Sequence, residues 1–222
     1  MTELSITLSL SLTSFILLLL AVFLGGTSLW KDIERRYVFS VMGLPISRGK
    51  YLLGKFCGIA CFILLSTALL TLLTVGVVAH TSSLYPPGHT VAWSNLLIAL
   101  TFDAFKYCLL VAIAFFFSTV STSFFLPIFG SITIFIAGNT TQEVFDYLQT
   151  QQGQALPPLA KNMALALYYL LPNFGAFDLK ANAIYSLPVN GTELLLTAAY
   201  GSIYMTILLS TATLLFSRRE LQ

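Results

Sequence analysis

The sequence predicts an all-α polytopic membrane protein with about five transmembrane helices. Of its 222 residues, 57% are hydrophobic and only 9% are charged. Soluble domains carry about 25% charged residues, so this chain has too few polar groups to solvate a globular surface of its size. Long apolar runs recur along the sequence, and most of its basic residues gather beside their ends. We therefore treat residues 1–222 as a single transmembrane domain.

Five apolar runs are predicted to cross the membrane, because a spanning helix needs about 20 apolar residues. No basic residue precedes the first run, which favours a membrane span over a signal peptide. The fourth run is short and contains Pro127 and Gly130, so we expect it to be kinked or buried against protein. The predicted spans cover residues 4–29, 52–79, 95–118, 124–138 and 193–216.

The stretch of residues 30–55, between the first two runs, is the most basic part of the chain. It holds six of the eleven Lys and Arg residues, and Arg218 and Arg219 follow the last run. Residues 80–94 contain neither Lys nor Arg. Basic residues gather on the cytoplasmic side of membrane proteins, so we expect the N-terminus outside and the C-terminus in the cytoplasm. The same rule accounts for the net charge of +2, which is therefore no indication of nucleic-acid binding.

Residues 31–44 have the pattern of a short amphipathic helix on the cytoplasmic side. Apolar residues recur at near-helical spacing, and Pro45 disfavours helix at the residue before it. Such a helix is either a docking surface for a partner or a helix lying on the membrane surface. The apolar side is formed by Ile33, Tyr37, Val41 and Leu44.

Asp103 and Lys106 lie inside the third predicted span, three residues apart. At 1.5 Å per residue, Asp103 is about 15 Å from Trp93, near the middle of the membrane. A charge at that depth costs several kcal/mol unless it is paired or faces a polar cavity. The pair is therefore either part of a substrate path or a self-neutralised pair facing neighbouring helices.

Residues 139–192 are too long for a simple turn and are predicted to lie at the outer face. Two helices are expected there, at residues 141–151 and 161–171, separated by Gly153, Pro157 and Pro158. Together they would form a helical hairpin on the outside of the membrane.

The chain carries no phosphate-binding Gly-Lys-Ser/Thr loop and no metalloprotease or serine-hydrolase motif. An ATPase or other catalytic site of its own is therefore not expected. Its three cysteines lack neighbouring ligands at metal-binding spacing, and His80 and His89 are interpreted as solvated loop residues. No metal site is predicted.

Several short motifs occur in order along the chain. They are Glu34-Arg35-Arg36, Leu44-Pro45-Ile46-Ser47-Arg48, Tyr51 with Gly54-Lys55, Leu170 to Phe174, Phe177-Asp178-Leu179 and Phe216 to Leu221. In this order they resemble the membrane subunits of ATP-binding-cassette exporters in the ABC-2 permease family. The resemblance covers nearly the whole chain and is nearest to the subgroup with the nitrous-oxide-reductase maturation permease.

This resemblance implies a permease subunit that exports an unidentified substrate across the bacterial inner membrane. A separate cytoplasmic ATPase dimer would bind ATP and Mg²⁺, this chain would bind no cofactor, and a second permease copy or a similar permease would complete the assembly. Asp103 and Lys106 would be path residues. The residues expected to couple to the ATPase are Glu34, Arg35, Arg36, Tyr37 and Val41.

Two other interpretations stay open. The chain could be a non-transport membrane subunit that anchors a partner complex, or an ATP-independent channel or carrier. Family members usually have six spans, and this sequence begins where their second span would. We therefore expect either a truncated start or a shortened member whose missing helix is absent or supplied by another chain.

Overall fold

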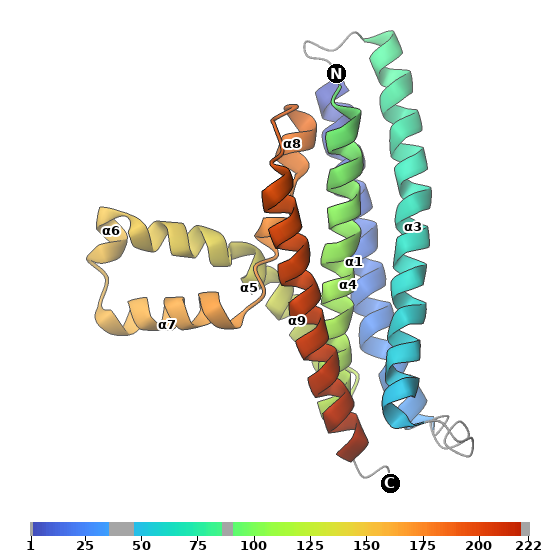
Figure 1. The fold of residues 1–222 in the computed structure, drawn as a ribbon, viewed down its shortest axis with the longest axis vertical. Helices are drawn as coiled ribbons and strands as arrows, with labels where there is room; N and C mark the ends of the chain where they lie inside the picture. The colour runs from blue at the N-terminus through green and yellow to red at the C-terminus, as the bar shows by residue number, and fades with distance from the viewer. Residues whose placement is uncertain (1, 36–46, 86–90, 219–222) are drawn as a thin grey trace.

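A computed structural model describes residues 2–35, 47–85 and 91–218 of the chain, and these residues form helices and no strand (Figure 1). Four of the helices, α1, α3, α4 and α9, are long and apolar enough to cross a membrane. The elements are α1 (Thr2–Glu34), α3 (Arg48–Leu84), α4 (Trp93–Val120), α5 (Phe125–Gln149), α6 (Gln151–Gln154), α7 (Pro158–Leu170), the 3₁₀ turn η1 (Gly175–Phe177), α8 (Lys180–Ile184) and α9 (Gly191–Arg218).

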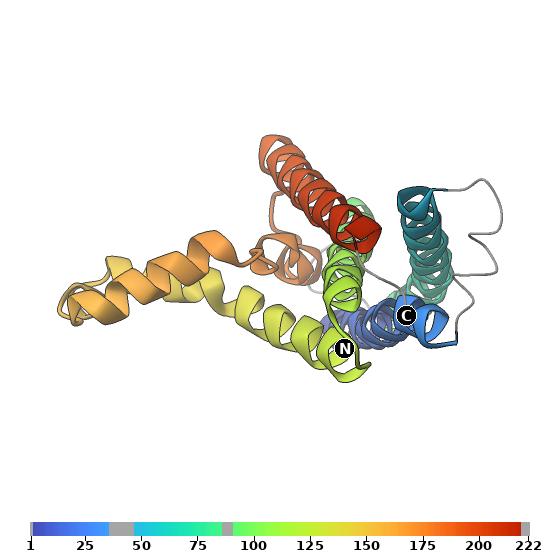
Figure 2. The ribbon, with the colours of Figure 1, turned by 90° about the horizontal axis from the view of Figure 1, so that it is seen from below.

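Helix α4 is the centre of the molecule. Viewed from one end of the bundle, it lies between α1, α3, α5 and α9 (Figure 2). Every residue from Tyr107 to Phe115 is buried, which is the pattern of a helix covered by protein on all sides. The surrounding helices are apolar on their outer faces as well, so the exposed surface of the bundle suits lipid rather than water.

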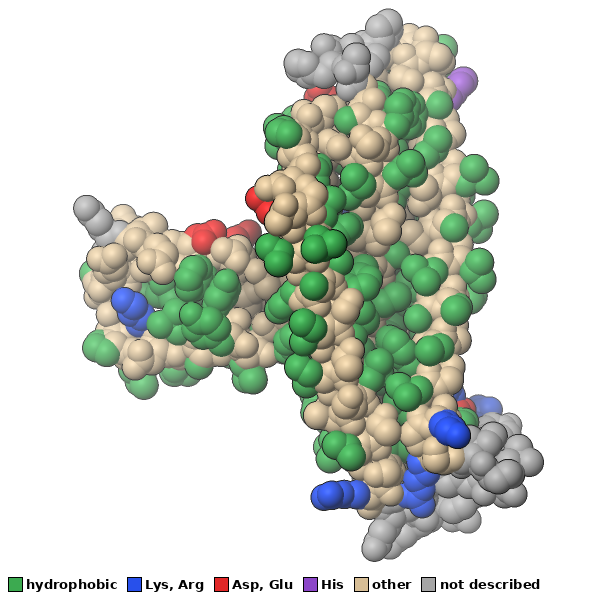
Figure 3. Space-filling view, in the orientation of Figure 1, with side chains coloured by type: hydrophobic (Ala, Val, Ile, Leu, Met, Phe, Trp, Pro, Cys, Tyr) green, Lys and Arg blue, Asp and Glu red, His purple; other side chains and the backbone are tan. Residues whose placement is uncertain are grey.

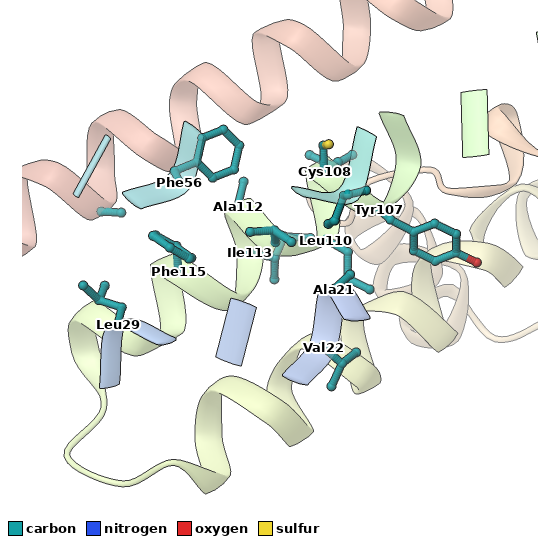
Figure 4. Close-up of a cluster of buried hydrophobic side chains, with 14 of the residues drawn as sticks. Ala21, Val22, Leu29, Phe56, Tyr107, Cys108, Leu110, Ala112, Ile113 and Phe115 are labelled. Carbon is teal, nitrogen blue, oxygen red and sulfur yellow. The ribbon is translucent and has the colours of Figure 1, made fainter. Parts of the chain in front are cut away.

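The core between α1, α3 and α4 is built from closely packed apolar side chains (Figure 4). The rings of Phe56 on α3 and Phe115 on α4 meet edge to face, with centroids 5.9 Å apart. On α1, a Cβ atom at Gly25 would lie 3.1 Å from the Cβ of Ala114. A glycine at this position therefore lets α1 approach α4 closely.

Hydrogen bonds at the two ends of the bundle show which chain segments lie together at each end. At one end, Thr2 donates to the carbonyl of Tyr85, and Asn95 donates to the carbonyl of Leu187. At the other end, Trp30 donates to the carbonyl of Thr122. The chain from Thr122 to Leu187 therefore runs from one end of the bundle to the other.

The chain consequently passes along the bundle five times, and the fourth pass, between α4 and α9, is discontinuous. The first part of α5 packs beside α1 and α4, and the chain then leaves the side of the bundle as an arm formed by the end of α5, α6 and α7 (Figures 1 and 2). It returns through η1 and α8, next to the start of α4. The sequence predicted a separate short span at residues 124–138, whereas the structure places these residues in the first half of a longer helix.

Two predicted boundaries differ from the structure. Helix α5 continues through residues 139–141, where the sequence was expected to start a new helix, because no Pro or Gly follows Gly138 until Gly153. Pro127 lies in the first turn of α5, where a missing N–H costs little, and it does not interrupt the helix.

Asp32 belongs to the last turn of α1 rather than to a separate helix over residues 31–44. Residues 36–44 of that predicted helix lie outside the described part.

We expect Gly201→Ala to destabilise the fold, because a Cβ atom there would lie 2.5 Å from Phe105 of α4 and 2.8 Å from Phe177 of η1. Overpacking of this kind costs about 1–3 kcal/mol. Gly76→Ala on α3 is the matched control, since a Cβ atom there meets nothing within 4 Å. Thermal unfolding of the purified variants in detergent, followed by circular dichroism, compares the two. Equal melting temperatures for both variants would contradict this packing.

Candidate functional site

One end of the bundle carries most of the positive charge, and we name it the basic end. It is the end where α1 stops, α3 starts and α9 stops, and Lys and Arg side chains gather there in the lower part of Figure 3. The opposite end contains the start of α4 and α8. The described basic residues of the basic end are Lys31, Arg35, Arg48, Lys50, Lys55 and Arg218.

At the basic end, the carboxylate of Asp32 joins α1 to α3. The Tyr51 hydroxyl and the Lys55 ammonium group both donate to the Oδ2 atom of Asp32. Lys55 also donates to the carbonyl of Ser28, at 2.7 Å. We name these four residues the Asp32 cluster.

The local sequence explains the geometry of the Asp32 cluster. Ser28 and Asp32 are four residues apart on α1, and Tyr51 and Lys55 are four apart on α3, so each pair shares one helix face. The two faces meet because α1 and α3 pack against each other in opposite directions. The side chains of Asp32 and Lys55 each expose 20% of their surface. Hydrogen bonds to charged groups contribute about 1.5–3 kcal/mol, more than a fully solvated ion pair would.

Two further contacts connect the remaining helix ends at the basic end. Arg48, at the start of α3, donates to the carbonyl of Ser217 near the end of α9, at 3.3 Å. The ring of Trp30 on α1 lies 5.4 Å from that of Phe124, which precedes α5. The basic end is therefore a connected unit that involves α1, α3, α5 and α9.

The predicted coupling residues are only partly described by the structure. Glu34 ends α1 and Arg35 follows it in a turn, and both side chains are exposed. Arg36, Tyr37 and Val41 lie outside the described residues. Sequence reasoning did not single out Asp32 as the link between the two helices. One sequence pattern could have indicated it. Tyr51 and Lys55 are four residues apart and therefore share a helix face, and Asp32 is an acidic residue in the same basic stretch.

Asp103 and Lys106 are both buried within the bundle, each exposing 3% of its surface. The Ser14 hydroxyl on α1 donates to Asp103. The Lys106 ammonium group lies 5.2 Å from the ring centroid of Phe135 on α5, within the range of a cation–π contact. Each charge thus has its own neighbour on a different helix. Burial against neighbouring helices is compatible with both interpretations, so the substrate path and the self-neutralised pair both stay predictions.

The arm and α9 enclose a hollow of about 430 Å³ that is rich in tyrosine. Tyr200 accepts a hydrogen bond from the backbone N–H of Asn173, at 3.0 Å, and Tyr204 donates to the carbonyl of Leu170, at 2.8 Å. On the arm, the rings of Phe145 and Tyr168 stack with centroids 4.3 Å apart. The two tyrosine hydrogen bonds join the base of the arm to α9, and the ring stack joins the two helices of the arm, although no residue of α7 is buried.

Within the three described ranges, no group of three His, Cys, Asp or Glu side chains is arranged to hold a metal ion. His80 lies at the exposed end of α3, and His89 is outside the described part.

Comparison with known proteins identifies the family. No curated protein matches this sequence. The model of the ABC-2 family transporter proteins matches residues 2–221, nearly the whole chain, in agreement with the resemblance of the basic-stretch motifs. The four long apolar helices and the family match together make it an integral membrane protein with a general role in transport. The chain belongs to the ABC-2 family of transporter proteins.

Proposed function

We propose that this chain is the permease subunit of an ATP-driven exporter in the bacterial cytoplasmic membrane. A separate cytoplasmic ATPase dimer would bind ATP and Mg²⁺ and dock on residues 31–44. The observation that carries the proposal is the Asp32 cluster. It joins α1 and α3 on the two sides of the segment 36–46, so a force on that segment is transmitted to both helices. The family match supports the transport role.

The proposed orientation places the basic end in the cytoplasm. Six described Lys and Arg residues lie there, and the described residues of the 80–94 connection at the other end include neither. This asymmetry is the pattern of cytoplasmic loops in membrane proteins. The N-terminus would then be outside, and the C-terminus would be in the cytoplasm beside the ATPase.

The proposed cycle treats the permease as a two-state element biased by the ATPase. Closure of the ATPase dimer on ATP moves the docked segment, and the Asp32 cluster makes α1 and α3 move with it. Since α4 is packed against both helices, the motion reaches the centre of the bundle. Glu34, Arg35 and Arg36 are the proposed charged contacts, with Tyr37 and Val41 as packing contacts.

The proposed assembly contains two permeases for each ATPase pair. Closed two-fold symmetry is the commonest arrangement of oligomers, and an ATPase dimer presents two equivalent docking sites. The arm also favours a protein neighbour. Its exposed charged residues Glu143 and Asp146 project from the side of an otherwise apolar bundle, where lipid solvates charge poorly.

The first prediction from this proposal concerns docking. Reversing Arg35 and Arg36 to Glu should weaken association with the ATPase by at least about tenfold, because like charges at a docking face cost several kcal/mol. The reversal of Lys161 to Glu on the arm is the control and should leave association unchanged. Co-purification of the ATPase in mild detergent measures both. Full recovery of the ATPase with the double reversal would overturn the docking assignment.

The second prediction concerns the Asp32 cluster. Asp32→Lys or Lys55→Asp alone should lower ATP hydrolysis by the reconstituted complex by about tenfold, since a lost charged hydrogen bond is worth about 1.5–3 kcal/mol. The double variant Asp32→Lys/Lys55→Asp restores opposite charges and should recover most of the rate. ATPase co-purification should persist in all three variants, because the cluster positions the segment rather than contacting the partner.

The matched control exchanges two charges far from the cluster and from the proposed docking residues, Glu193→Lys with Lys161→Asp. This pair introduces the same charges without touching the Asp32 cluster, so its single and double variants should show no mutual rescue. If the Asp32 and Lys55 variants behave additively as well, the cluster does not link the two helices in the working cycle.

The third prediction concerns orientation. In a background without Cys57, Cys61 and Cys108, single cysteines at Ser83 or Asn190 should react with an impermeant maleimide added to intact cells. A cysteine at Gln222 should react only after the cells are opened. Labelling of Gln222 in intact cells would reverse the proposed orientation.

A further inference from the structure

Between α3 and α9 runs an open apolar groove with a volume of about 550 Å³, within the ~300–1,000 Å³ typical of small-ligand sites. Apolar side chains line the hollow between the two helices in Figure 3. Its lining residues are Leu53 of α3 and Thr206, Leu209, Ser210, Thr213 and Leu214 of α9.

The groove is closed at the basic end of the bundle. There a Cβ atom at Gly49 would lie 2.7 Å from the Cγ2 atom of Thr213, so α3 and α9 are in direct contact. Just beyond this contact, Arg48 reaches from α3 to the carbonyl of Ser217 on α9. Lys50, in the first turn of α3, and Arg218, the last residue of α9, are both exposed. The apolar groove thus ends at the end of the bundle that carries these three cationic residues.

One buried polar atom in the groove has no hydrogen-bond partner among the described residues. The hydroxyl group of Thr206, which also lines the groove, donates back to the carbonyl of Ser202 on its own helix, at 2.7 Å. The Oγ1 atom of Thr213 is buried and has no hydrogen-bond partner within the described part of the chain. Buried hydroxyl groups are normally satisfied, so this atom indicates a site for an acceptor from outside the chain. It lies five residues before Arg218, about 7.5 Å along the helix axis.

We infer that this groove binds an anionic phospholipid from the leaflet at the basic end. The phosphate lies at Arg48 and Arg218. The glycerol ester oxygens lie deeper in the membrane than the phosphate and accept a hydrogen bond from Thr213. An acyl chain lies along Leu53, Leu209 and Leu214. The order of cation, hydroxyl donor and apolar wall follows the order of phosphate, ester and hydrocarbon in a phospholipid.

The charges favour a lipid over a second copy of the chain in this groove. In a two-fold dimer with parallel orientation, equivalent residues of the two copies come to the same depth. A second copy covering the groove would therefore bring Arg48, Lys50 and Arg218 toward the same three cations. An anionic lipid instead neutralises them, and basic residues near a membrane surface attract such lipids by about fivefold in affinity per residue.

Native mass spectrometry of the purified chain, titrated with phosphatidylglycerol or phosphatidylcholine, tests this inference without the ATPase. The wild-type chain should retain phosphatidylglycerol more strongly than phosphatidylcholine. Arg218→Gln should lower phosphatidylglycerol affinity by about fivefold, and Arg48→Gln/Arg218→Gln by more than tenfold. Lys161→Gln on the arm removes the same charge elsewhere and should have no effect. Because Arg218 is exposed at a helix end, its variant should fold normally.

A second pair of variants tests the apolar part of the groove. Ser210→Phe fills the groove and should abolish selective retention, whereas Ile207→Phe places the same ring on an exposed position of α9 outside the lining. Equal retention of the two lipids by the wild-type chain, or no change in any groove variant, would overturn the inference. So would efficient disulfide formation between two copies carrying Leu53→Cys in the background without the three native cysteines, because the groove would then be covered by protein.

Discussion

The burial of the central part of α4 is the constraint on which the rest of the structure depends. A helix that is apolar on every side can be packed among other helices on all sides. The residues from Tyr107 to Phe115 are covered in this way. Close approach of α1 at Gly25 and the ring contacts of Phe56 and Phe115 follow from this. The surrounding helices then need only one protein-facing side, and their other sides are left for lipid. Asp103 and Lys106 are tolerated within this core because Ser14 and Phe135 provide a neighbour for each charge.

The polar contacts are concentrated where the helices end rather than along them. Packing among apolar side chains is weakly directional, so it does not by itself fix how far one helix slides past another. The Asp32 cluster, the contact of Arg48 with Ser217 and that of Trp30 with Thr122 supply this missing specificity at the basic end. Asn95 does the same at the other end by donating to two carbonyls of the segment around α8. In the proposed exporter, these end contacts determine which helices move together.

Much of this architecture follows from the sequence, for identifiable reasons. The four long spans are encoded in apolar runs that need no knowledge of tertiary contacts, and the family follows from motifs in the basic stretch. The course of α5 could not be predicted, because Pro127 and Gly130 suggest a short broken span, whereas first-turn placement makes Pro127 harmless. The role of Asp32 could not be predicted from the sequence either, because it depends on which faces of α1 and α3 meet. Of the residues proposed to contact the ATPase, Arg36, Tyr37 and Val41 lie outside the described part, so their assignment depends on the sequence alone.

The Asp32 cluster has a consequence for the cost of partner binding. By joining Asp32 to Lys55, it fixes the end of α1 beside the start of α3. The chain entropy lost in bringing two chain segments together is therefore lost when the permease folds and not when a partner binds. A protein that binds at these two helix ends then loses less affinity to ordering than it would on two unlinked helix ends. Weak, reversible contacts on a small surface can then be sufficient for binding. This suits a partner that changes conformation in every cycle without dissociating.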